Sequence, residues 1–119
     1  MTTERFPRVK VLATGGTIGS WGRDRMDLVE YPDFGRKVPF EEVFEGIPEL
    51  RGIARLELDQ FRNISSTAVT PVDMLELSQR INDIFRDDPD LAGVVVTHGT
   101  NSLQETAYFL HLTVRSDRP

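Results

Sequence analysis

The stretch Val9-Lys-Val-Leu-Ala-Thr-Gly-Gly-Thr17 decides how this chain folds. A short β-compatible segment, Arg8–Ala13, runs directly into a pair of glycines, and this order is typical of a strand that ends in a tight turn. A second stretch repeats the pattern, because the apolar run Val94-Val-Val96 leads into Thr97-His-Gly-Thr100. We therefore predict two strands, each ending in a glycine turn that carries hydroxyl groups.

Helical patterns lie between and after these strands. Pro39 begins a short one, in which Val43 and Phe44 are expected to face the core, and Pro48 ends it. A longer helix begins at Thr70-Pro-Val-Asp73, where a threonine cap, a proline at the first helical position and an acid three residues after the cap agree. Its expected buried stripe consists of Met74, Leu75, Leu77, Ile81, Ile84 and Phe85.

Two further strand patterns and a last helix complete the predicted fold. Residues 54–61 alternate between apolar and polar side chains, as in a strand with one wet face, whereas Gly93–Thr97 is apolar throughout, as in a strand under helices on both faces. Ser102-Leu-Gln-Glu105 repeats the capping pattern, and its helix runs to about Arg115. The alternation predicts an α/β fold, a doubly wound and mostly parallel sheet with helices on both faces. Right-handed crossovers then place the turns on one rim, and we expect residues 1–119 to be the first part of a larger domain.

The composition argues against several classes of function. The net charge is −5 and the only lysines are Lys10 and Lys37, whereas nucleic-acid binding needs clustered cations. There is no cysteine, and His98 and His111 alone give no ligand set for a structural zinc, so we expect no metal and no cofactor. The N-terminus lacks the apolar core of a secretory signal and no stretch is long enough to span a membrane. We expect a cytoplasmic protein without nucleic-acid or membrane partners.

The hydroxyl groups of the two turns indicate nucleophilic chemistry. A threonine on a glycine-rich turn is exposed, and nearby backbone N–H groups can hold the oxyanion of a tetrahedral intermediate. Thr17 is so placed, with Gly16 allowing close approach of a substrate; the structural alternative is that Thr17 and Thr100 only satisfy turn backbone groups or cap helices. His98 stands between the two threonines of the second turn, where it could act as a general base or only structure the turn. Phosphate binding is disfavoured because the first turn has neither a Gly-x-Gly-x-x-Gly pattern nor a following lysine.

Three segments of the sequence, taken together, identify a protein family more specifically than either glycine turn does alone. They are Ala13-Thr-Gly-Gly-Thr-Ile18, Asn63-Ile-Ser-Ser66 and Val96-Thr-His-Gly-Thr-Asn-Ser-Leu-Gln-Glu-Thr-Ala107. In order and spacing the chain resembles the N-terminal domain of the bacterial-type L-asparaginase and glutaminase family. The resemblance implies an amidohydrolase that acts on the side-chain amide of asparagine or a related small amide through a threonine nucleophile and an acyl-enzyme. It also implies a homo-oligomer, a tetramer or a dimer.

The same resemblance assigns roles to individual residues. Thr17 would be the nucleophile, Thr100 the second catalytic threonine, and Ser66 a contact to the substrate carboxylate. Residues 19–37 match neither a helical nor a strand period, and we expect them to form a mobile lid loop. In the family a lid tyrosine helps to activate the nucleophile; Tyr31 is the candidate, and its alternative is a loop-packing aromatic. The remaining expected substrate-binding residues are Gly16, Thr67, Gly99 and Asn101.

Three departures from the family pattern bear on activity. Asn101 stands where the family usually has an aspartate for the substrate's α-ammonium, and Thr67 stands where glutamine is common. A neutral amide binds an ammonium group more weakly than a carboxylate does, so we predict that the protein binds asparagine poorly or prefers an amide without an α-ammonium group. The alternative is that an acidic residue from the rest of the full-length protein, or from a partner subunit, binds the α-ammonium group instead. In the family the second catalytic threonine pairs with a buried lysine further along the chain, and neither Lys10 nor Lys37 fits that position. We therefore expect these 119 residues alone to be inactive. The alternative function is a non-catalytic domain that binds an amide or an amino acid.

Overall fold

A parallel sheet of three strands forms the centre of the structure, a computed structural model that describes residues 6–119. The strands are β1 (Arg8–Ala13), β4 (Arg55–Asp59) and β5 (Gly93–Thr97), in the order β4-β1-β5. β1 lies between two parallel neighbours, as the α/β prediction requires. Residues 1–5, which entered the argument against a secretory signal, lie outside the described residues.

The central strand is also the most buried one. Val11, Leu12 and Ala13 are each exposed by 4% or less. Directly after them Thr14 bonds to the carbonyl of Thr97 through both its backbone N–H (3.1 Å) and its Oγ1 (2.7 Å). Thr14, the first residue after β1, is therefore fixed to the end of β5. These two bonds hold the two glycine turns side by side where they begin.

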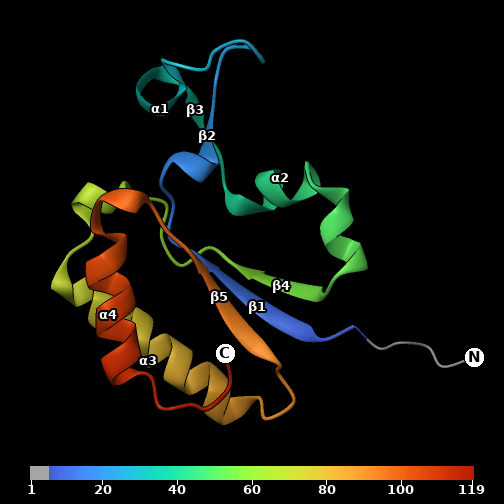
Figure 1. Cartoon of the computed structure of the whole chain (residues 1–119), viewed down its shortest axis with the longest axis vertical. Helices are drawn as coiled ribbons and strands as arrows, with labels where there is room; N and C mark the ends of the chain where they lie inside the picture. The colour runs from blue at the N-terminus through green and yellow to red at the C-terminus, as the bar shows by residue number, and fades with distance from the viewer. Residues whose placement is uncertain (1–5) are drawn as a thin grey trace, which may run out of the picture.

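Two long helices cover one face of the sheet (Figure 1). α3 (Pro71–Asp87) begins at the predicted capping box, in which Thr70 Oγ1 accepts from the Asp73 N–H and an Asp73 carboxylate oxygen accepts from the Thr70 N–H (2.8 Å). α4 (Leu103–Thr113) packs beside it. No helix within residues 6–119 combines the length and the apolar character needed to cross a membrane. The buried core cluster consists of Leu12, Leu77, Ile81 and Phe85.

Three details of these elements differ from the prediction. Leu75 is 49% exposed and lies outside the buried stripe of α3. On β5, Val95 is also 49% exposed, so within the described residues helices do not cover both faces of this strand. α4 has no capping box at its start, because a 3-10 turn (η4, Thr100–Ser102) precedes it and Ser102 Oγ donates instead to the carbonyl of Ser66 (2.7 Å).

Residues 20–37, which we call the arm, are more regular than a loop. β2 (Ser20–Trp21) and β3 (Arg36–Lys37) pair in antiparallel fashion, and the short helix α1 (Tyr31–Phe34) lies between them. The arm projects beyond the rim of the sheet (Figure 1). Hydrophobic periodicity in the sequence does not reveal these elements, because each is only two to four residues long. That the arm moves as a lid stays a prediction.

The short helix after the arm does not join the core. α2 (Phe40–Glu45) has Pro39 as its N-cap, and it is followed by a 3-10 turn, η2 (Pro48–Gly52). Val43 and Phe44 are only half-buried and lie outside the core cluster, so the expectation that they face the core is wrong. Val38, just before the helix, is the buried residue here, at 1% exposed.

Candidate active site

The two glycine turns touch each other beyond the carboxyl ends of β1 and β5. A Cβ atom added to Gly16 would lie 2.8 Å from the Cα of Gly99, and one added to Gly99 would lie 2.6 Å from Ser66 Oγ. Both distances are shorter than real Cβ contacts allow. Gly15 and Gly16 also have positive φ angles of 106° and 89°, which side chains disfavour. The three segments of the sequence motif therefore meet on one rim, as predicted.

Ser66 connects the third segment to the second turn. It is 3% exposed and begins a 3-10 turn, η3 (Ser66–Ala68). Its Oγ accepts a hydrogen bond from the backbone N–H of Asn101 (3.1 Å), and its carbonyl accepts the bond from Ser102. Because the hydroxyl oxygen serves as an acceptor here, its hydrogen remains available for a ligand.

A cavity of about 360 Å³ lies between the turns and the arm. This volume is within the range of small-molecule sites. Six of the eight predicted site residues line it: Gly16, Thr17, Ser66, Gly99, Thr100 and Asn101. The other lining residues are Pro32, Asp33, Lys37, Asn63, Ile64 and Ser65.

The two threonines of the turns have unused hydroxyl groups. Thr17 begins the 3-10 turn η1 (Thr17–Gly19), and Thr100 begins η4. Both residues are exposed, and the N-cap position of each 3-10 turn is taken by the preceding glycine, Gly16 or Gly99. The threonines are therefore not the cap residues of these turns, and both side chains line the cavity.

Two predicted site residues do not line the cavity. The hydroxyl of Thr67 lies 2.9 Å from Ser65 Oγ, and this bond holds it in the turn beside the cavity. Tyr31 begins α1 and is half-buried, while the next two residues, Pro32 and Asp33, reach the cavity wall. The structure therefore places Tyr31 next to the site without bringing it to Thr17.

Lys37 is a lining residue that the sequence did not assign to the site. Its Nζ donates to the carbonyl of Pro32 (2.9 Å) and to Ser20 Oγ. The pairing of Ser20 with Lys37 across the arm brings the side chain to the cavity. A strand pair of two residues on each side carries no periodic signal, so this position could not be predicted from the sequence.

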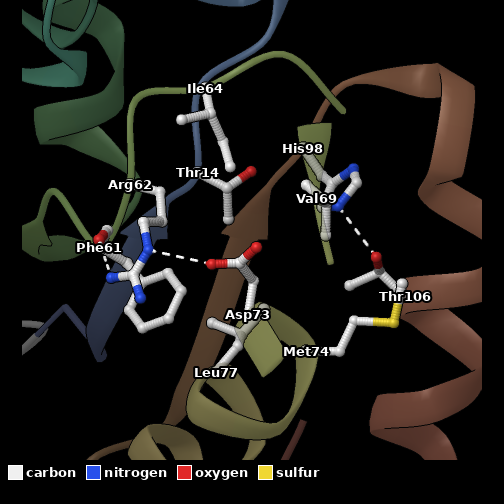
Figure 2. A pocket seen from close by; sticks show the side chains of 10 residues that line it. All are labelled: Thr14, Phe61, Arg62, Ile64, Val69, Asp73, Met74, Leu77, His98 and Thr106. Atoms are coloured by element: carbon white, nitrogen blue, oxygen red, sulfur yellow. Dashed lines mark hydrogen bonds and ion pairs between the residues drawn. The ribbon is translucent and has the colours of Figure 1, made fainter. Parts of the chain in front are cut away.

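His98 belongs to the second turn, and both of its ring nitrogens have partners; Figure 2 shows the one formed with Thr106. Its Nδ1 lies 2.6 Å from the carbonyl of Gly99 and donates to it, because a carbonyl only accepts, and its Nε2 forms a hydrogen bond with Thr106 Oγ1 at 3.0 Å. The ring borders a second cavity of about 10 Å³, also lined by Thr14 and Asp73, which has room for about one water molecule. This geometry fits the turn-structuring interpretation.

The described residues offer a polar site without metal ligands. Within residues 6–119 no group of three histidines or carboxylates is arranged to hold a metal ion. Hydroxyl-bearing residues, glycines and the two amide side chains of Asn63 and Asn101 make up most of the cavity wall, with Asp33 and Lys37 on the side of the arm. Such a wall suits a small polar ligand presented to a threonine hydroxyl.

These observations define an α/β domain with a hydroxyl-lined ligand cavity at the carboxyl ends of its parallel strands, the usual place for ligands in such sheets. A model of the family described as Asparaginase, N-terminal, matches residues 8–119. The chain belongs to the asparaginase family.

Named relatives agree with this assignment. The chain is 42% identical over 114 residues to L-asparaginase 2 of Bacillus subtilis, covering 96% of the chain and 30% of the relative. It is 37% identical over 118 residues to a glutaminase-asparaginase of Pseudomonas fluorescens, covering 99% and 32%. A crystal structure of a probable cytoplasmic L-asparaginase from Campylobacter jejuni matches with a TM-score of 0.80 and 32% identity, covering 93% of this chain and 32% of that one. The chain thus spans about a third of the length of these relatives.

Proposed function

We propose that this chain supplies the threonine-bearing part of an amidohydrolase site that releases ammonia from a small side-chain amide. The observation that carries the proposal is the single cavity that Thr17, Thr100 and Ser66 share, with the first two hydroxyls exposed. An exposed hydroxyl on a glycine turn is a suitable nucleophile once a base accepts its proton. Membership of the asparaginase family supports the same reaction.

In the proposed reaction Thr17 Oγ1 attacks the amide carbon and gives up its proton. The carbon becomes tetrahedral, and backbone N–H groups of the Gly15–Thr17 turn stabilise the negative oxygen. The C–N bond then breaks, the leaving nitrogen takes up the proton that the hydroxyl gave up and departs as ammonia, and an ester links the acyl group to Thr17. Water hydrolyses this ester and restores the hydroxyl. Thr100 acts as the second catalytic threonine, and Tyr31 activates the nucleophile when the arm closes.

The charge of the cavity bears on the choice of amide. Asn101 lines the cavity with a neutral side chain, so a ligand ammonium gains no ionic partner at this position. Thr67 lies outside the lining. We therefore propose that asparagine binds poorly and that the preferred substrate is an amide without an α-ammonium group. Gly16 and Gly99 serve this site by letting the two turns and Ser66 pack in direct contact along the cavity wall.

The setting of the full-length protein is also part of the proposal. The family resemblance supports a homo-oligomer, a dimer or a tetramer, and supports a lysine from the rest of the protein as a partner of Thr100. The Campylobacter jejuni relative is described as probably cytoplasmic, which supports the same location here. Nothing in the reaction calls for a cofactor.

Ammonia release by the full-length protein tests this function. Asparagine, glutamine and succinamate, which is asparagine without its amino group, are the three substrates. We expect release from succinamate, loss of release in Thr17→Ala, and partial retention in Thr17→Ser, because serine keeps the hydroxyl. Binding of an amide without ammonia release would instead identify the non-catalytic binding domain.

A further inference from the structure

We propose that Lys37 determines the charge of the substrate, because its ammonium group binds the carboxylate of an anionic amide. The inference rests on the proposed function of the cavity and adds to it a specificity-determining residue on the arm. It predicts that the preferred ligand is a monoanion, with an amide at one end and a carboxylate at the other.

The position of the Lys37 ammonium is fixed by two neutral groups. Nζ donates to the carbonyl of Pro32 (2.9 Å) and to Ser20 Oγ, and Ser20 is only 7% exposed. An ammonium group has three hydrogens to donate. Two are used in these bonds, and because Lys37 lines the cavity the third is available to a ligand there.

The charge of Lys37 has no ionic partner in the described part of the chain. No carboxylate of residues 6–119 lies within 4.0 Å of its Nζ, whereas the neighbouring Arg36 pairs with Glu42 at 2.9 Å. Asp33, the one carboxylate among the lining residues, is exposed and forms no ion pair with Lys37. The arm thus presents to the cavity an ammonium group that forms no ion pair within residues 6–119, on the same side as the exposed carboxylate of Asp33.

The side of the cavity formed by Ser66 and Asn101 offers a hydrogen-bond donor to an anion and no negative charge to an ammonium group. Ser66 has a hydroxyl hydrogen free to donate, since its oxygen accepts from Asn101. Asn101 is neutral, so it offers no charge to an ammonium group. A carboxylate that meets the Lys37 ammonium receives a charge-assisted hydrogen bond, which is about twice as strong as a neutral one. The amide end of the same ligand is then left to the turn that carries Thr17.

The matched ligands succinamate and butyramide test the inference in the full-length protein. Both are four-carbon amides, and they differ by a carboxylate in place of a methyl group. We expect kcat/KM to favour succinamate, and Lys37→Gln to lower the succinamate-to-butyramide ratio by about tenfold or more. Lys37→Arg, which keeps the charge, should retain most of the preference.

Arg36→Gln is the matched control. It removes the same charge one residue away and outside the cavity lining, so the ratio should not change. Added salt should raise the KM for succinamate in the wild type and not in Lys37→Gln, because ions screen the attraction. A role of Lys37 in arm shape alone would lower activity on both amides equally, and that result would overturn the inference.

Calorimetry of succinamate binding separates this inference from the proposed function. If the wild-type protein binds succinamate through Lys37 but releases no ammonia, the inference stands and the function fails. If ammonia is released and Lys37→Gln leaves both binding and the substrate ratio unchanged, the function stands and the inference fails. Asp33→Asn should keep or raise succinamate affinity, and a loss equal to that of Lys37→Gln would also overturn the inference.

Discussion

The backbone N–H of Asn101 donates a hydrogen bond to Ser66 Oγ over 3.1 Å, and this bond joins two segments that are 35 residues apart in the chain. It holds the second glycine turn against η3 and turns the hydroxyl hydrogen of Ser66 away from the backbone. The same contact therefore builds the cavity wall and prepares a donor for the substrate.

Ser66→Ala should raise KM more than it lowers kcat. The variant removes a donor to the substrate and also leaves the Asn101 N–H without its acceptor, at a cost in stability of about 1 kcal/mol. Steady-state kinetics and a thermal melt of the full-length protein measure the two effects. An unchanged KM for succinamate would exclude Ser66 from substrate binding.

Gly99→Ala should destabilise the protein and disrupt the site. The new methyl group would lie 2.6 Å from Ser66 Oγ, so one of the two segments must shift, at about 1–3 kcal/mol. Gly52→Ala is the matched control, because a Cβ at this position meets nothing within 4 Å. Chemical denaturation of both variants checks the difference, and equal stabilities would show that the close contact of the turns is wrong.

The capping box of α3 should make stability depend on acid pH. The Thr70 backbone N–H, then its side chain, lowers the pKa of Asp73, so the charged form is favoured in the folded state. A folded-state pKa below the unfolded value means that this stabilisation is present above the ordinary pKa of 3.8 and is lost as pH falls through the lower, folded value. Asp73→Asn should therefore flatten the stability curve in this acid range.

Denaturation at a series of pH values measures this slope. The pKa of Asp88 is also lowered, by hydrogen bonds from Arg8, so Asp88 likewise makes stability fall at acid pH. Part of the dependence of stability on pH should therefore remain in Asp73→Asn. Identical slopes in the wild type and the variant would contradict the assigned role of the capping box.

Asn101→Asp should move the substrate preference toward asparagine. The carboxylate adds an ionic partner for the α-ammonium, while the backbone bond from residue 101 to Ser66 is kept. We expect the ratio of kcat/KM for asparagine over succinamate to rise by about tenfold. A wild-type protein that already hydrolyses asparagine at the rates of its relatives would contradict the premise.

Strongly patterned segments allowed most of the fold to be predicted from the sequence. β1 and β5 were found as apolar runs that end in glycine, and α3 was found from its capping box together with its helical period. The rim that unites Thr17, Ser66 and Thr100 followed from the handedness of the crossovers. These features are local or follow from general topology, so a single sequence contains them.

The errors arose where long-range contacts override local pattern. Ser102 was expected to cap α4, but the adjacent Ser66 carbonyl takes its hydroxyl. Val43 and Phe44 fitted a buried helical face, but α2 lies outside the core cluster of the sheet. Lys37 reaches the cavity only through a two-residue strand pair, which no periodicity indicates.

In the proposed reaction Thr17 becomes acylated by an amide substrate in the cavity. Mass spectrometry of the full-length protein, quenched during turnover of succinamate and digested, measures this directly. We expect a succinyl ester on the peptide that contains Thr17, and we expect both this ester and ammonia release to be absent in Thr17→Ala. Ammonia release that persists in Thr17→Ala, without an adduct on the wild-type peptide, would contradict the proposed reaction.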